Sequence, residues 1–64
     1  MQVGEKIKTL RLKLGLSQEE LAVKSGVSRV TISKLENGSQ SITTNKTLAM
    51  LGEALGCKAS YFLQ

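Results

Sequence analysis

Residues 16–38 read LSQEELAVKSGVSRVTISKLENG, and this stretch contains two helix start signals in close succession. Ser17 and Glu20 form an S-x-x-E capping box, in which each side chain accepts a hydrogen bond from a backbone N–H that the start of a helix leaves free. Ser28 is the corresponding cap of a second helix. Each start is flanked by two apolar residues with the spacing of a hydrophobic staple: Leu16 with Leu21, and Val27 with Ile32. The stretch therefore predicts two short helices.

The connection between these two helices centres on Gly26. Glycine adopts positive φ without strain, so the backbone can turn sharply there. Ala22 is small enough to let the first helix of the pair approach the second closely, and Gly38, which follows Asn37, ends the second helix. Two short helices joined by such a turn form a helix-turn-helix.

The residues before this unit predict another helix, over residues 3–14. Its apolar residues recur every three or four positions, which places them on one face of a helix: Val3, Ile7, Leu10 and Leu14. Leu12 lies off this face, and we expect it to be partly exposed. Gly15 then ends the helix.

The residues after Gly38 predict a polar loop followed by a fourth helix over residues 45–55. We expect Ile42 to point inward and to anchor the loop to the core, and Thr43 or Thr44 to cap the helix. The leucines that face inward on this helix are Leu48, Leu51 and Leu55.

Gly52 lies on the same face of the fourth helix and permits close packing against another element. Residues 58–63, KASYFL, predict a last short helix after Gly56. The expected fold is therefore all-α, with five short helices forming one domain over residues 1–64. A chain of this length buries only roughly 60% of its unfolded surface, so we expect modest stability.

Composition argues against several classes of function. The chain has no histidine and a single cysteine, Cys57, so neither a Ser–His or Cys–His catalytic pair, nor a zinc site, nor an internal disulfide can be assembled from it. The acidic residues show no acid–base grouping apart from the adjacent Glu19 and Glu20, which point in different directions on a helix. We expect no enzymatic activity, no cofactor, no metal and no small-molecule ligand, with Cys57 acting as a small buried hydrophobic residue.

The charge pattern points to a cytoplasmic protein with an anionic partner. The N-terminal segment MQVGEKIKTLRLK is interrupted by charge and lacks the apolar stretch of a signal peptide. No apolar run approaches the length of about 18 residues that a membrane span needs. The formal net charge of +4 raises the expectation of binding to nucleic acid.

Residues 16–38 resemble the helix-turn-helix of the phage repressor/Cro family, also called the XRE family. The matching positions are Gln18, Leu21, Ala22, Gly26, Val27, Ile32, Leu35, Glu36, Asn37 and Gly38. The remaining predicted helices also fit, so the resemblance covers nearly the whole chain. It implies a lambda-repressor-like domain whose third helix enters the major groove of double-stranded DNA. The loop after Gly38 departs from many relatives because it lacks their proline.

The outward face of the third helix provides the candidates for reading bases, which are Arg29, Val30, Ser33 and Lys34. Arg29 can donate two hydrogen bonds to a guanine, and Val30 suits a thymine methyl group. The alternatives are a phosphate contact or a solvated charge for Arg29, an exposed residue without a role for Val30, and a phosphate contact for Lys34.

Contacts to the DNA backbone are expected where helices start, because free N–H groups and a partial positive charge attract phosphate there. Together with the positions that the resemblance implies, the candidates are Ser17, Gln18, Ser28, Thr31, Asn37, Thr43, Thr44 and Lys46. Ser28 is first a helix cap, and Asn37 has the alternative role of ending the third helix. We expect the remaining lysines, Lys6, Lys8, Lys13, Lys24 and Lys58, to supply diffuse charge and solubility.

Glu36 places a negative charge on the helix that would face DNA. The resemblance implies that it pairs with Arg11 and so ties the first helix to the third. The alternative is two independent surface charges.

A single domain buries too little surface on DNA for strong specificity, so we expect a homodimer that binds a near-palindromic operator. Ala59 and Phe62 in the last helix are the candidate dimer contacts, and the alternative is that they belong to the core. The predicted function is a transcriptional regulator, most simply a repressor. One alternative is an antitoxin of a toxin–antitoxin pair. The other is a protein-interaction module on the same fold, and Arg29 and Lys34 argue against this second alternative.

Overall fold

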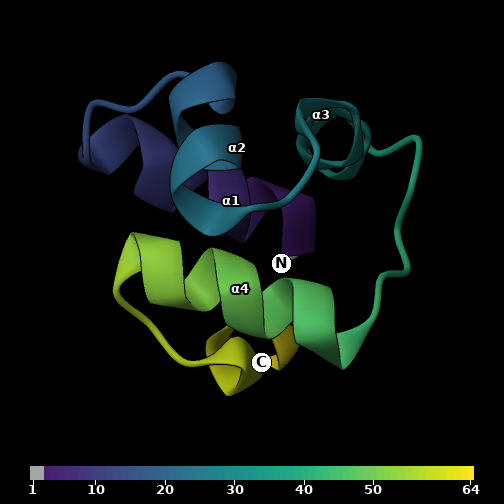
Figure 1. Ribbon diagram of the computed structural model, residues 1–64. Coiled ribbons are helices and arrows are strands. Elements are labelled where there is room, and N and C mark those ends of the chain that lie inside the picture. The colour runs from purple at the N-terminus through teal and green to yellow at the C-terminus, as the bar shows by residue number, and fades with distance from the viewer. Residues whose placement is uncertain (1–2) are drawn as a thin grey trace.

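The computed structural model describes residues 3–64 and folds them into four α-helices and a 3-10 helix (Figure 1). The elements in chain order are α1 (Val3–Lys13), α2 (Gln18–Ser25), α3 (Arg29–Asn37), α4 (Asn45–Leu55) and η1 (Ala59–Leu63). No strand occurs within this described range, and the expected all-α class is confirmed. In Figure 1, α2 and α3 lie on one side of α4, and η1 lies on the other.

The predicted caps define where the helices begin. Ser17 and Glu20 form a complete capping box, with Ser17 Oγ 3.0 Å from Glu20 N and Glu20 Oε1 2.9 Å from Ser17 N. The Ser28 hydroxyl accepts a hydrogen bond from the N–H of Val30 at 3.1 Å. Of the two threonines considered for α4, Thr44 is the cap, because its hydroxyl accepts from the N–H of Thr47.

The turn between α2 and α3 depends on Gly26, which has a φ of 77°. An L-residue rarely adopts this left-handed conformation, so glycine relieves the strain of the turn. The Gly26 N–H closes the last turn of α2 on the carbonyl of Ala22 at 2.9 Å. The sharp turn between α2 and α3 is therefore encoded locally by the glycine at position 26.

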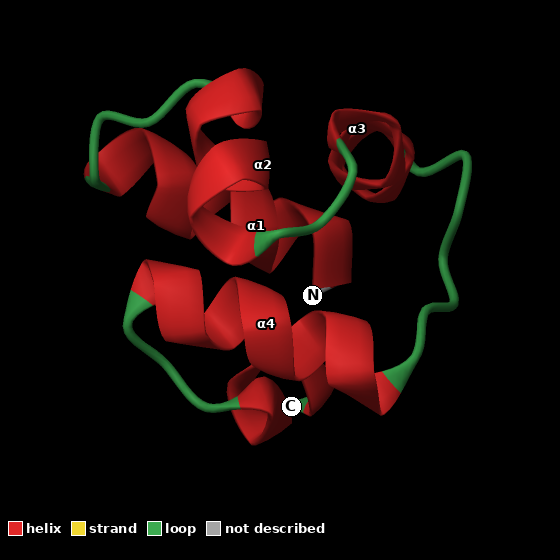
Figure 2. Ribbon diagram, viewed as in Figure 1, coloured by secondary structure: helices red, strands yellow, loops and turns green. Residues whose placement is uncertain are grey.

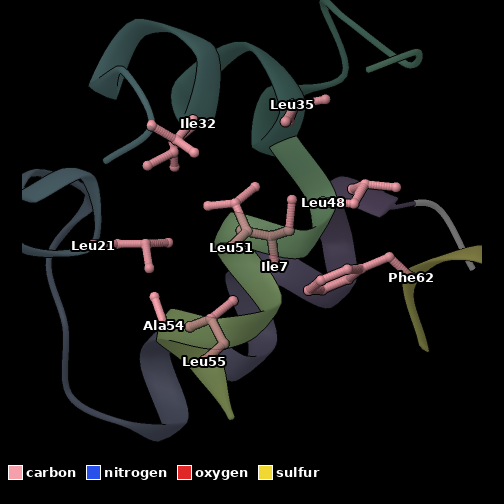
Figure 3. Close-up of a cluster of buried hydrophobic side chains, with 10 residues drawn as sticks. Ile7, Leu21, Ile32, Leu35, Leu48, Leu51, Ala54, Leu55 and Phe62 are labelled. Atoms are coloured by element: carbon pink, nitrogen blue, oxygen red, sulfur yellow. The ribbon is translucent and has the colours of Figure 1, made fainter. Parts of the chain in front are cut away.

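The core lies where the four α-helices and η1 meet. Its buried apolar residues are Ile7, Leu21, Val27, Ile32, Leu35, Leu48, Leu51, Ala54, Leu55 and Phe62. Phe62 from η1 points toward Ile7 and Leu48 (Figure 3). Burying each large apolar side chain contributes about 1.5–3 kcal/mol, so these contacts are the main stabilising term.

Two expected core residues are exposed. Leu14 was expected on the inward face of the first helix, but α1 ends at Lys13 and the side chain of Leu14 is 51% exposed in the following turn. Ile42 was expected to anchor the loop between α3 and α4, but it is 83% exposed. Within this loop (green in Figure 2), the side-chain amide of Gln40 donates a hydrogen bond to the carbonyl of Ile42 at 3.0 Å.

Lys6 was expected to be a diffuse surface charge, and this expectation is wrong. Its side chain is 6% exposed, and Nζ donates to the carbonyl oxygens of Tyr61 at 2.9 Å and Gln64 at 2.8 Å. The ammonium also lies 5.0 Å from the centre of the Tyr61 ring, a cation–π distance. The two hydrogen bonds of Lys6 therefore hold the C-terminal segment against α1.

Cys57 packs against the core and is partly exposed. Burial raises the pKa of its thiol, which keeps it protonated and a poor nucleophile. Over residues 3–64, no helix has the length and apolar character needed to cross a membrane.

Candidate nucleic-acid interface

The helix α3 presents one face to the core and the opposite face to solvent. Ile32 and Leu35 lie on the inner face, where they are buried in the core. Arg29 and Lys34 are exposed on the outer face, and the side chain of Val30 is 60% exposed. A shallow hollow on this surface is lined by the four candidate base-reading residues, Arg29, Val30, Ser33 and Lys34. The structure thus brings together the residues that the sequence singled out.

The C-terminal turn of α3 is tied to α1 by the expected ion pair. Arg11 Nε lies 2.8 Å from Glu36 Oε2, and Arg11 Nη2 lies 2.9 Å from Glu36 Oε1. Both side chains are almost fully covered, with exposed fractions of 9% for Arg11 and 4% for Glu36. The hydrogen bonds to Glu36 raise the pKa of Arg11, so the guanidinium stays charged. The alternative of two independent surface charges is excluded by this geometry.

Arg11 also reaches the turn between α1 and α2, where its Nη1 donates to the carbonyl oxygen of Leu16 at 2.7 Å. Gln18 joins the same group, because its Nε2 lies 3.2 Å from Glu36 Oε1. The contact between Gln18 and Glu36 was not predicted. It depends on how α2 crosses α3, and sequence spacing carries no signal for such a crossing.

The start of α2 carries the features that favour a phosphate contact. The first backbone hydrogen bond of this helix runs from Leu21 N to the carbonyl of Ser17, and the Ser17 hydroxyl accepts a hydrogen bond from Glu20 N. The N–H groups of Gln18 and Glu19 are therefore left for solvent or for an anion. The Gln18 amide uses one of its two N–H bonds on Glu36 and keeps the other.

Three candidate backbone residues, Ser17, Ser28 and Thr44, act as helix caps. A hydroxyl that accepts a hydrogen bond from the backbone retains its own hydrogen. Capping and a phosphate contact are therefore compatible for Ser28, whereas the hydrogen of the Ser17 hydroxyl has the Glu20 carboxylate as a competing partner. The Thr44 hydroxyl lies 3.0 Å from that of Thr47, so its hydrogen has a competing partner.

The other candidate backbone residues differ in accessibility. Asn37 is exposed, and its Oδ1 accepts a hydrogen bond from Ser39 N at 2.8 Å, so its amide nitrogen is left to donate. Lys46 is exposed, whereas Thr31 and Thr43 are partly buried. Their contacts with DNA remain predictions.

Lys8 was assigned to diffuse charge, but it borders the candidate interface. It lines a surface hollow together with Arg11, Gln18, Ser33, Glu36 and Asn37. Its position one turn before Arg11 on α1 was a usable signal, since residues three apart share a helix face.

The charges of this surface are unevenly paired. Arg11 and Glu36 form the one ion pair found over residues 3–64, so the negative charge on α3 is neutralised from within. The cations Lys8, Arg29 and Lys34 make no ion pair in this range. A polyanion that approaches α3 therefore meets uncompensated positive charge.

The candidate dimer contacts lie in η1. Phe62 is 1% exposed and belongs to the core, which corrects its assignment as a contact between protomers. The aromatic ring fills the space between α1 and α4, where an apolar side chain is more stable than in water. Ala59 is partly exposed, and its dimer contact remains a prediction.

Comparison with known proteins agrees with this geometry. A family model described as helix-turn-helix matches residues 7–62. The HTH-type transcriptional repressor RghR of Bacillus subtilis (strain 168) is 40% identical over 52 residues, which are 81% of this chain. The chain spans 38% of the length of that relative.

Two solved structures are also similar. The crystal structure of SinR, the master regulator for biofilm formation, in complex with DNA superposes with a TM-score of 0.94 at 28% identity, and covers 98% of this chain and 100% of that chain. The complex of SinR with SinI gives a TM-score of 0.92 at 28% identity, and covers 98% of this chain and 61% of that chain. The resemblance inferred from residues 16–38 is confirmed.

Proposed function

We propose that this chain, which belongs to the helix-turn-helix family, binds double-stranded DNA and regulates transcription. The observation that carries the proposal is the outer face of α3. Arg29, Val30, Ser33 and Lys34 line one hollow there, while the acidic Glu36 is neutralised by Arg11. The similarity to SinR solved with DNA and to a transcriptional repressor supports the same reading.

In the proposed mechanism α3 enters the major groove, which is wide enough for an α-helix. Arg29, the first residue of α3, donates two hydrogen bonds to guanine O6 and N7. Val30 contacts a thymine methyl group, and Ser33 and Lys34 reach the neighbouring base edges. These four side chains supply sequence preference.

Phosphate contacts on both sides of the groove hold α3 in register. The N–H groups at the start of α2 and the Asn37 amide bind the backbone near the two ends of the helix-turn-helix. Lys46 and Lys8 add charge that releases counterions, so the affinity falls as the salt concentration rises.

We propose further that two protomers bind together and that the outcome is repression. One domain of this kind buries about 600–1,000 Å² on DNA, and a dimer doubles the contacts by reading half-sites about 34 Å apart. The chain acts by binding, without catalysis, and in the cytoplasm.

Selection of bound sequences from a random DNA pool tests this function. We expect an enriched near-palindrome whose half-sites are separated by about one helical turn. An enriched single half-site would contradict the dimer but not DNA reading. Retention of random DNA without any enriched sequence would contradict specificity, and the absence of binding even at low salt would overturn the proposal in favour of a protein-interaction module.

A further inference from the structure

We infer that Gly4 is a positioning residue for the recognition helix α3, an inference that rests on the proposed function. Gly4 lies in the first turn of α1 and is buried. A Cβ atom built on Gly4 would lie 1.7 Å from the carbonyl oxygen of Leu35, 2.5 Å from the carbonyl carbon of Leu35 and 3.1 Å from Cα of Glu36. The backbone of α1 therefore rests directly on the backbone of the last turn of α3.

Space, and not backbone conformation, is the reason for glycine at this position. The glycines with positive φ are Gly15, Gly26, Gly38 and Gly56, and Gly4 is not among them. Alanine is otherwise the more favourable residue in a helix. Glycine lowers the stability of the helix relative to alanine, but any side chain at this position would collide with backbone atoms. Backbone atoms cannot rotate away as a flexible side chain can.

Gly4 and Arg11 together define how α1 holds α3. They are seven residues apart, which is close to two helical turns, so both lie on the same face of α1. Gly4 contacts the backbone of Leu35, and Arg11 binds the carboxylate of the next residue, Glu36. The ion pair fixes the rotation of the last turn of α3 about the helix axis. The contact at Gly4 fixes how closely the same turn lies to the core.

This spacing matters because the four candidate base-reading residues lie on the opposite face of α3. An ordinary Cβ contact needs 3.4–4 Å, so a methyl group at Gly4 would force α1 and α3 apart by more than an ångström. A recognition side chain has to be held within about 0.5 Å of its productive position. Contacts to bases would be lost, whereas long lysine side chains would still reach phosphates.

The test compares Gly4→Ala with Gly52→Ala. Gly52 is a matched control, because it is also a buried helical glycine whose added Cβ would meet a backbone carbonyl, that of Cys57 at 2.5 Å. The strain at Gly52 lies between α4 and the segment before η1, away from the contact between α1 and α3. Both variants are measured for thermal unfolding, for affinity to the selected operator and for affinity to random DNA, with trimethylamine N-oxide added if a variant unfolds.

Both variants are expected to lose stability. Only Gly4→Ala should lower the ratio of operator affinity to random-DNA affinity. The expected decrease is roughly tenfold, which corresponds to the loss of one base contact. In the DNA-free protein, the amide NMR signals of α3 should move more in Gly4→Ala than in Gly52→Ala. Equal ratios in the two variants would overturn the inference, and so would a Gly4→Ala chain that stays unfolded with the osmolyte, because Gly4 would then serve folding alone. Failure of the unsubstituted chain to prefer any sequence would instead contradict the specificity on which the proposed function depends.

Discussion

The guanidinium of Arg11 and the carboxylate of Glu36 meet through two hydrogen bonds of 2.8 and 2.9 Å, although 25 residues separate them in the chain. This pair brings α1 to the last turn of α3 and cancels the one negative charge on the recognition helix. The ion pair therefore has two separable effects, one on stability and one on the electrostatic potential that DNA meets.

Replacing Arg11 by methionine should lower the free energy of unfolding by about 3 kcal/mol, because Glu36 is left covered and unpaired. Urea unfolding followed by circular dichroism measures the change. Lys13→Met is the matched control, since Lys13 is an exposed cation at the end of the same helix, and it should change stability little. Equal effects of the two substitutions would show that the pair contributes nothing beyond a surface charge.

Arg29→Ala should weaken binding to the selected operator by about 1–3 kcal/mol and relax the preference at one base pair. Lys46→Ala should weaken binding to all sequences alike and flatten the dependence of affinity on salt. Fluorescence anisotropy with operator, single-base variants and random DNA at several salt concentrations distinguishes the two. If Arg29→Ala weakens every sequence equally, Arg29 contacts phosphate and not a base.

The capping box predicts a dependence of stability on acid pH. Hydrogen bonds from the backbone and side chain of Ser17 hold the pKa of Glu20 below its ordinary value of 4.5. Folding lowers the pKa of this carboxyl, so its ionised form stabilises the folded state at pH values above 4.5, the ordinary pKa that applies to the unfolded chain. This contribution is lost as the pH falls through 4.5 and then through the lower pKa of the folded state. The free energy of unfolding should therefore decrease over this acidic range.

Glu20→Gln isolates that contribution, because glutamine keeps the hydrogen bond of the box but does not titrate. The decrease in stability on acidification should be smaller in Glu20→Gln than in the unsubstituted chain. The control is Glu19→Gln, which changes the neighbouring exposed carboxylate outside the box. A pH profile unaltered by Glu20→Gln would rule out the capping box as the source.

Lys6→Met should release the C-terminal segment, because the carbonyls of Tyr61 and Gln64 lose a charged donor while the apolar stem of the side chain is kept. The expected loss is about 1.5–3 kcal/mol, the range for hydrogen bonds to a charged group. Hydrogen exchange should accelerate in η1 more than in α2. Lys8→Met, on the exposed side of the same helix, is the control, and unchanged protection of η1 in Lys6→Met would contradict the anchoring role.

The sequence by itself determined where the helices begin and turn. The cap at Ser28, the capping box at Ser17 and Glu20, and the glycine turn at Gly26 all lie where they were predicted. These features are short-range, since the donor and the acceptor of each are a few residues apart, and local hydrogen bonding therefore specifies them before any packing occurs. The outer face of α3 followed from the same helical periodicity.

The tertiary structure alone decided which residues meet across helices. The closeness of Gly4 to Leu35, the hydrogen bond of Gln18 to Glu36 and the burial of Lys6 all depend on the angles at which α1, α2 and η1 cross their neighbours. Core packing sets those angles, and many side chains share in it at once, so no spacing within one segment encodes them. For the same reason Ile42, judged by its apolar character, was placed inside, although the loop leaves it in solvent.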